Sequence, residues 1–213
     1  TVKSTSTRSV AFFGTATYSY QRRYMLSRTV RYEGTNKLGR STSARWLPTW
    51  NISGAWNAHE EKFWQTLEPT LSNFTLKASY LLTADRGPAD VSNSLVIIQS
   101  YNPWRPFTNV KESGLLLKDV ENSALTYEKK HELNIGAEIG FIDNRINFAI
   151  DWYKRDNYDL IGLVNSAGTG VKITKFANVA SMKSHGVELT LSTKNIRTKD
   201  FSWNTDFIFS HAK

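Results

Sequence analysis

Three aromatic residues and one arginine gather in the segment YNPWRPF, residues 101–107, and could bind a ligand. Tyr101, Trp104 and Phe107 could stack on a sugar ring or pack on a peptide, and Arg105 could donate hydrogen bonds. The alternative is that these aromatic side chains anchor a long loop to its neighbours or to a partner subunit. We therefore treat the four residues as candidate substrate-binding residues.

No catalytic or metal-binding pattern is found elsewhere in the chain. It has no cysteine, and His59, His131, His185 and His211 lie too far apart for a metal-ligand spacing. The segment SAGTGVKIT, residues 166–174, lacks the GxxxxGK[ST] spacing of a phosphate-binding loop, and no GxSxG motif occurs. We expect no catalytic residues, no metal and no cofactor, and we do not expect an enzyme.

Carboxylates are the remaining residues with chemical potential. Glu132, Glu138, Asp151, Glu188 and Asp206 all occupy the polar faces of predicted strands. They could line the path of a substrate. The alternative is that they are simply the polar residues of a surface that contacts water or another domain.

Composition narrows the class of protein. The net charge is +8, but the lysines and arginines are dispersed and form no basic stripe with interleaved aromatic residues, so no nucleic-acid partner is expected. The chain of 213 residues contains no apolar run of 18 residues, which excludes a membrane-spanning helix. A membrane-spanning β-barrel is still possible, since its strands need only about ten alternating residues.

The dominant pattern is alternation of apolar and polar residues. In HELNIGAEIGFIDNRINFAIDWYKR, residues 131–155, Ile135 shares one face with other apolar residues and Asn134 lies on the opposite, polar face. Pro48 predicts a bulge or a strand end close to it. The predicted strands cover about 9–20, 24–33, 44–57 and 75–84, a hairpin over 130–155, then 185–193 and 201–210. Segments 85–123 and 156–184 are predicted to be irregular, and 58–73 to contain a short helical turn.

These eight predicted strands are longer than the usual five or six residues, and short and long connections alternate between them. Short turns at one end and long loops at the other are typical of an outer-membrane barrel, as are aromatic residues near strand ends, such as Tyr18, Tyr20 and Tyr24. The sequence therefore predicts an all-β, antiparallel transmembrane β-barrel. A large soluble sheet with these residues in its core is the alternative.

Five segments in order resemble the SusC/RagA-like TonB-linked outer-membrane transporters of Bacteroidetes. They lie at residues 22–40, 45–64, 71–87, 127–161 and 178–207, and include RRYMLSRTVRYEGTNKLGR and NVASMKSHGVELTLSTKNIRTKDFSWNTDF. The resemblance implies that residues 1–213 are part of one barrel domain, a partial arc of about eight strands from a barrel of about 22. It also implies that the plug domain is absent from this chain.

The resemblance further implies TonB-dependent import of oligosaccharides or peptides across the bacterial outer membrane. The expected partners are a SusD-like surface lipoprotein, TonB through the missing plug region, and the lipid bilayer. The face that holds Ile135 should then contact lipid, and the face that holds Asn134 should contact water or plug. Two alternatives stay open: a passive porin or adhesin-like barrel, and a soluble β-rich carbohydrate-binding module.

Overall fold

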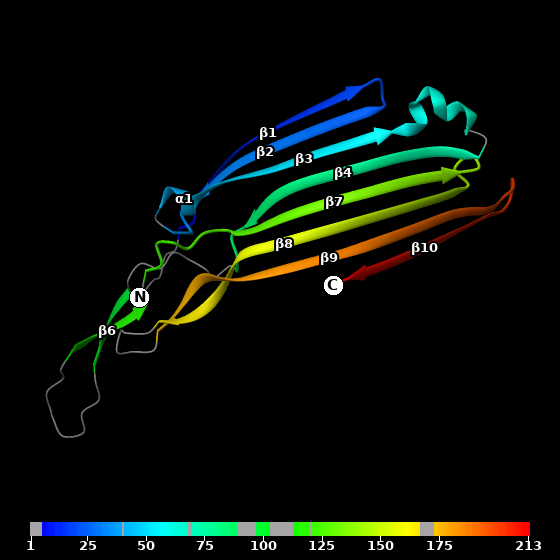
Figure 1. The fold of residues 1–213 in the computed structure, drawn as a ribbon. Helices are drawn as coiled ribbons and strands as arrows, with labels where there is room; N and C mark the ends of the chain where they lie inside the picture. The colour runs from blue at the N-terminus through cyan, green and yellow to red at the C-terminus, as the bar shows by residue number, and fades with distance from the viewer. Residues whose placement is uncertain are drawn as a thin grey trace.

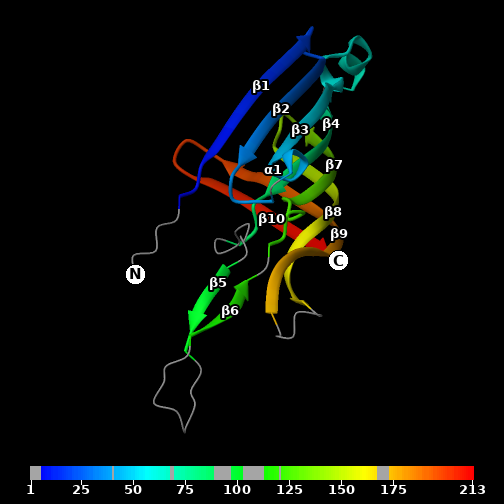
Figure 2. The same cartoon turned by 90° about the vertical axis from the view of Figure 1, so that its left-hand side faces the viewer.

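A computed structural model describes residues 6–39, 41–67, 70–88, 97–102, 113–119, 121–166 and 173–213. Its main feature is an eight-stranded sheet with the order β1-β2-β3-β4-β7-β8-β9-β10, in which every neighbouring pair is antiparallel (Figure 1). The sheet curves but does not close on itself, so that β1 and β10 form its two edges (Figure 2). The described chain is therefore an arc.

The strands of the sheet are long. They are β1 (Ser9–Tyr20), β2 (Tyr24–Thr35), β3 (Trp46–Asn57), β4 (Leu71–Asp85), β7 (Glu128–Phe141), β8 (Ile146–Ser166), β9 (Ile173–Arg197) and β10 (Ser202–Ala212). The eight predicted strands are all present. Pro48 lies two residues after β3 begins, and pairing of β3 with β4 begins only at Trp50, which confirms the predicted strand end near Pro48.

Two predictions of irregular structure were wrong. Strands β8 and β9 continue as a pair through much of 156–184, up to Ser166 opposite Ile173. The register shifts between Asn157 and Ile161, and Asp159 has a positive φ of 57°, so the alternation that identifies strands is interrupted there. The segment 85–123 holds a separate antiparallel hairpin of β5 (Ile97–Tyr101) and β6 (Gly114–Asp119).

The connections lie at the two ends of the sheet, and the longest of them, residues 86–127, lies at the end opposite the tight turns (Figure 1). One end, the short-turn end, has tight turns at 21–23 and 142–145 and a turn at 198–201. It also holds the 3₁₀ helices η1 (Ala58–Glu60) and η2 (Lys62–Thr66), which confirm the helical turn predicted there. The other end, the long-connection end, holds helix α1 (Thr42–Arg45) and the β5–β6 hairpin. No helix in the described part of the chain is long and apolar enough to cross a membrane.

Very little of the described chain is a hydrophobic core. The buried apolar side chains all lie in connections, outside the eight strands of the sheet. They are Leu38, Ala44, Ala58, Trp64, Leu125 and Tyr127. No second layer covers the sheet among the described residues, whereas a soluble β-sandwich buries one face of each sheet against the other. This arrangement argues against the soluble sheet that the sequence left open.

Candidate substrate-facing wall and its mouth

One face of the sheet is apolar and exposed from edge to edge. Direct cross-strand neighbours on this face include Ala78, Ile135, Trp152 and Val187, and the Ile135 side chain is 43% exposed. Large exposed side chains on this face are Phe12, Tyr18, Tyr24, Leu26, Val30, Ile52, Leu76, Tyr80, Ile135, Trp152, Phe207 and Phe209. Since an exposed apolar patch of this extent is unfavourable in water, the face requires an apolar surrounding such as lipid.

The apolar band crosses the strands obliquely. Residue Ile150 of β8 aligns, through the intervening strands, with Tyr24 of β2. On β8 the outward apolar residues run from Ile146 to Trp152 and are centred at position 149, whereas on β2 they run from Tyr24 to Tyr32 and are centred at position 28. Position 28 of β2 aligns with position 154 of β8, so the centre of the apolar band shifts by five residues between these strands. That shift is about 17 Å along the strands over about 19 Å across them, which is an angle of about 40°. Strands of membrane barrels tilt by about 35–45° from the membrane normal.

The opposite, polar face is the hollow side of the arc. A depression of about 350 Å³ on it is lined by residues of six neighbouring strands, among them Thr17, Ser27, Ser53, Ser79 and Asn134. A depression that spans this many strands requires the sheet to be concave on that side. The polar face is therefore the inside of the arc and the apolar face the outside, as predicted from the sequence.

Two of the predicted carboxylates on this wall are neutralised by cations. Glu132, only 8% exposed, has an Oε2 that lies 3.0 Å from Lys130 Nζ and 3.0 Å from Arg155 Nε. Glu138 lies 2.5 Å from Lys77 Nζ across β4 and β7. These contacts favour the interpretation that both are structural groups of a polar wall rather than free substrate ligands.

Asp151, Glu188 and Asp206 differ from those two carboxylates. Asp151 and Glu188 are direct cross-strand neighbours on β8 and β9, and Asp206 lies opposite Ser192 on the same face. In the described part of the chain, no ion pair includes any of the three. The wall around β8 to β10 is therefore acidic, and adjacent like charges there are mutually unfavourable.

Aromatic side chains on the outer face mark both borders of the apolar band. Towards the long-connection end, Tyr80 lies 5.3 Å from Trp50 and 5.7 Å from His131, which in turn stacks 5.5 Å from Tyr158. Towards the short-turn end, the Tyr24 hydroxyl donates a 2.7 Å hydrogen bond to Glu61. Rings with polar tips are favoured at membrane–water interfaces.

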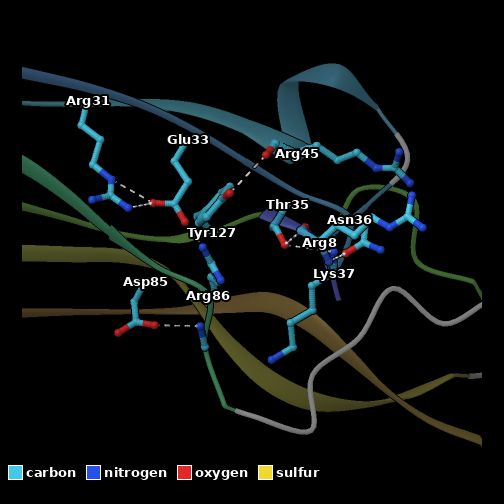
Figure 3. Close-up of polar contacts among 11 residues, drawn as sticks. Arg8, Arg31, Glu33, Thr35, Asn36, Lys37, Arg45, Asp85, Arg86 and Tyr127 are labelled. Carbon is cyan, nitrogen blue, oxygen red and sulfur yellow. Dashed lines mark hydrogen bonds and ion pairs between the residues drawn. The ribbon is translucent and has the colours of Figure 1, made fainter. Parts of the chain in front are cut away.

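A network of charged groups lies on the inner wall at the long-connection end (Figure 3). Glu33 Oε2 accepts hydrogen bonds from Arg31 Nη2 at 2.6 Å and Nε at 3.0 Å, and Oε1 pairs with Arg86. These three residues, with Asp85 and Tyr127, line a depression of about 420 Å³. Because the two arginines and two carboxylates nearly balance, the depression suits a polar or zwitterionic group more than a strongly charged one.

The connections at this end are tied together by Tyr127. Its hydroxyl donates a 3.1 Å hydrogen bond to the carbonyl of Arg45 (Figure 3), and its ring packs with Leu38 and Leu125. Burial raises the pKa of the Tyr127 phenol, so this group is a neutral donor throughout the physiological range. Lys37 reaches across to the carbonyl of Pro88 at 3.2 Å. The network fixes the rim of the wall, and sequence reasoning missed it.

Of the four residues predicted to bind substrate, only Tyr101 falls in the described part of the chain. It ends β5, opposite Gly114 of β6, and is 50% exposed. Trp104, Arg105 and Phe107 lie outside the described residues. The structure therefore neither brings the four together nor separates them.

The described residues contain no group of three or more side chains that could hold a metal ion. His131 stacks between Tyr80 and Tyr158 on the outer face, and His59 Nδ1 lies 3.1 Å from the carbonyl oxygen of Phe74. Each of these two histidines thus has a packing or hydrogen-bonding role.

A tilted antiparallel sheet with a lipid-compatible outside, a polar hollow inside and aromatic borders defines the wall of a membrane-spanning β-barrel. Comparison with known families gives the particular class: the profile described as "TonB dependent receptor-like, beta-barrel" matches residues 1–212, so the chain belongs to this family. Such barrels lie in the outer membrane, with short turns on the periplasmic side and long loops outside. The long-connection end is therefore extracellular.

Curated relatives agree with this assignment. The chain is 26% identical over 210 residues to TonB-dependent receptor P3 of Formosa agariphila, covering 97% of this chain. It is 28% identical over 201 residues to TonB-dependent receptor SusC of Bacteroides thetaiotaomicron, covering 93%. The chain spans about 20% of the length of each relative. The relatives are named as receptors, a class that is not enzymatic.

Solved structures show the same fold. The RagAB peptide importer in its open-open state superposes with a TM-score of 0.83 at 23% identity, over 96% of this chain and 21% of that one. The siderophore receptor PirA of Pseudomonas aeruginosa is more distant, with a TM-score of 0.58 at 16% identity over 97% of this chain and 34% of that one. The described arc therefore has the geometry of a segment of a much larger barrel.

Proposed function

We propose that this chain forms part of the wall of a TonB-dependent importer that carries oligosaccharides or peptides across the outer membrane. The observation that carries the proposal is the mainly polar inner face, with its hollow and neutralised carboxylates, behind an apolar outer face. Phe13, Met25 and Ile208 are exposed apolar exceptions on the inner face. A polar lumen suits a hydrated solute rather than a lipid. In this proposal the whole of residues 1–213 is barrel wall and the plug domain is encoded elsewhere in the protein.

The proposed partners are a SusD-like surface lipoprotein at the extracellular mouth and TonB, which would act through the plug. Support comes from the likeness to a receptor named SusC and to the barrel of a peptide importer. TonB would transmit the energy of the inner-membrane proton gradient and open the path. The inner wall would provide the surface along which the solute moves.

Two parts of the extracellular end are proposed to meet substrate first. One is the depression lined by Arg31, Glu33 and Arg86, whose balanced charges suit sugars and peptide backbones. The other is the loop with Tyr101, Trp104, Arg105 and Phe107, where aromatic rings would stack on a sugar or pack on a peptide. Neither places a catalytic group on the substrate.

Uptake by whole cells tests the function. Cells expressing the complete transporter take up fluorescent oligosaccharides or peptides, and a protonophore is added in a parallel culture. We expect uptake of one of the two substrate classes that stops when the proton gradient collapses. Uptake that continues unchanged with the protonophore would show a passive pore and contradict the proposal.

Replacement of Trp104 and Phe107 by alanine tests the loop. We expect the substrate concentration at half-maximal uptake to rise roughly thirtyfold, because stacking on each of the two rings contributes about 1 kcal/mol. The matched control is Phe63→Ala, an exposed aromatic residue at the short-turn end, which should leave uptake unchanged. Equal effects of the two changes would remove the loop from the binding site.

A further inference from the structure

On the outer face of β8, β9 and β10, apolar residues give way to basic residues as the strands approach the extracellular end. On β8, Trp152 is followed on the same face by Lys154, and on β9, Val187 is preceded by His185 and Lys183. On β10, Phe209 is followed by His211, and Lys213 continues the same face. We call Lys154, Lys183, His185, His211 and Lys213 the basic row, and all five are exposed.

The strand register holds the basic row together. Lys154 is the direct partner of His185, and Lys213 exchanges both backbone hydrogen bonds with His185, each at 2.9 Å. Direct cross-strand neighbours are about 5 Å apart, so Lys154 and Lys213 flank His185 within about 10 Å of each other. Lys183 lies one outward position further along β9. This spacing allows several cationic heads to reach one anionic group.

Little opposes the positive charge of this row. The acidic residue next to the basic row on this face is Asp156, which is the direct cross-strand partner of Lys183. Lys129, on the same face of β7, is instead paired with Asp159 at 2.6 Å. No ion pair in the described part of the chain includes Lys154, Lys183 or Lys213. Three lysines facing one aspartate leave the row positive even with neutral histidines.

The level of the row in the membrane follows from its neighbours. Trp152 lies directly below Lys154, and the stacked rings of Tyr80, His131 and Tyr158 continue the same border across β4 to β8. Aromatic side chains of this kind lie at the headgroup level, and lysine stems extend along apolar surface so that their ammonium groups reach the interface. The basic row therefore lies where the headgroups of the outer leaflet lie.

We infer that the basic row binds the phosphate group of an outer-leaflet lipid, whose acyl chains lie along the apolar face below it. Charge complementarity identifies the anionic headgroup, and continuity with the apolar band identifies a lipid rather than a soluble anion. This contact is separate from solute import, because the row faces away from the lumen. It would fix the depth and rotation of this part of the barrel in the membrane.

The test measures lipid binding by the complete transporter, purified in detergent. Phosphatidic acid is the phosphate-bearing probe, phosphatidylcholine with the same acyl chains is the zwitterionic probe, and inorganic phosphate is added as a soluble competitor. Native mass spectrometry counts retained lipid. We expect retention of phosphatidic acid over phosphatidylcholine, and the double variant Lys154→Gln/Lys183→Gln should weaken phosphatidic acid binding roughly thirtyfold. Millimolar inorganic phosphate should not displace the lipid.

The matched control is Lys194→Gln/Lys199→Gln, which removes the same charge from exposed positions at the periplasmic end. Equal retention by both double variants, or equal retention of the two lipids by the unmodified protein, would overturn the inference. Displacement by inorganic phosphate would overturn the lipid assignment. If the variant fails to fold, the salt dependence of lipid binding to the unmodified protein tests the inference instead. Binding of phosphatidic acid should weaken as the salt concentration rises, and salt-independent binding would refute the proposal.

Discussion

Arginine placed on the outer face of β7 should strongly destabilise the barrel in a bilayer. Ile135 is the position of choice, because its side chain lies outward between Ala78 and Trp152 and is 43% exposed. It lies inside the apolar stretch of β7, Leu133–Ile139, and so within the hydrocarbon region of the bilayer. An arginine costs about 2–4 kcal/mol at the midplane of a membrane barrel and less towards the interface, so we expect a loss of about 2 kcal/mol, which is roughly a 30-fold change in the unfolding equilibrium.

The same residue placed one position earlier is the control. Asn134 lies on the inner face, where its amide donates to Glu132 Oε1 at 3.1 Å. In Asn134→Arg this hydrogen bond is lost, but the guanidinium can pair with the same carboxylate in a water-filled lumen. We therefore expect a change of at most about 1 kcal/mol.

The assay is guanidinium unfolding of the complete barrel from phosphatidylcholine vesicles, followed by tryptophan fluorescence. The assignment of faces is supported if the guanidinium concentration at the unfolding midpoint decreases for Ile135→Arg and does not change for Asn134→Arg. Equal losses, or a larger loss for Asn134→Arg, would refute it, since both changes add the same charge and differ only in the face they occupy.

Three further substitutions test other parts of the arc. Arg28 faces outward between Ala16 and Ile52 near the middle of the apolar band, so Arg28→Leu should raise the unfolding free energy by about 2 kcal/mol in the same vesicle assay; an unchanged value would show that the arginine does not contact lipid. Tyr127→Phe should cost about 1 kcal/mol and speed proteolysis of the extracellular connections, and unchanged cleavage would exclude a tethering role. The hydrogen bond from Tyr24 lowers the pKa of Glu61. The contribution of this hydrogen bond to stability is therefore complete above the ordinary carboxyl pKa, and it is lost as the pH falls through the lowered pKa of Glu61. The protection of the adjoining periplasmic turn against hydrogen exchange, relative to the intrinsic rate at each pH, should therefore fall below about pH 4, and Glu61→Gln should abolish that pH dependence; a variant that keeps it would contradict the assignment.

Alternation predicted the strands wherever one face is mainly apolar. The β1–β2 hairpin follows its predicted turn because Val10, Phe12, Ala16 and Tyr18 share one face up to a tight turn, and β2 runs two residues past its predicted end. The extracellular half of β8 and β9 was missed, because a register shift and the left-handed Asp159 interrupt the period of two. Outside the membrane no lipid contacts the strands, so an apolar face is not needed there. The alternation of apolar and polar residues therefore weakens, although the backbone pairing of β8 with β9 continues.

The charged contacts of the wall could be predicted only in part. Alternation places Glu132 and Arg155 on one face, but their pairing depends on the register between β7 and β8. The contact of Glu33 with Arg86 joins positions 53 residues apart, and no local pattern indicates it. Sequence periodicity therefore assigns a residue to a face, whereas its partner is set by strand register and loop packing.

Alternation alone does not identify the face that contacts water, since a soluble sheet would show the same alternating sequence. Two independent geometric facts identify it. The apolar side chains of the sheet are exposed, and the described residues contain only a few buried apolar side chains, all of them in connections. The apolar band also crosses the strands at about 40°, and a soluble sheet has no reason to slant its apolar residues by the tilt of a membrane barrel. Water on the outside would leave that band unsolvated, so lipid has to lie outside and the polar hollow within.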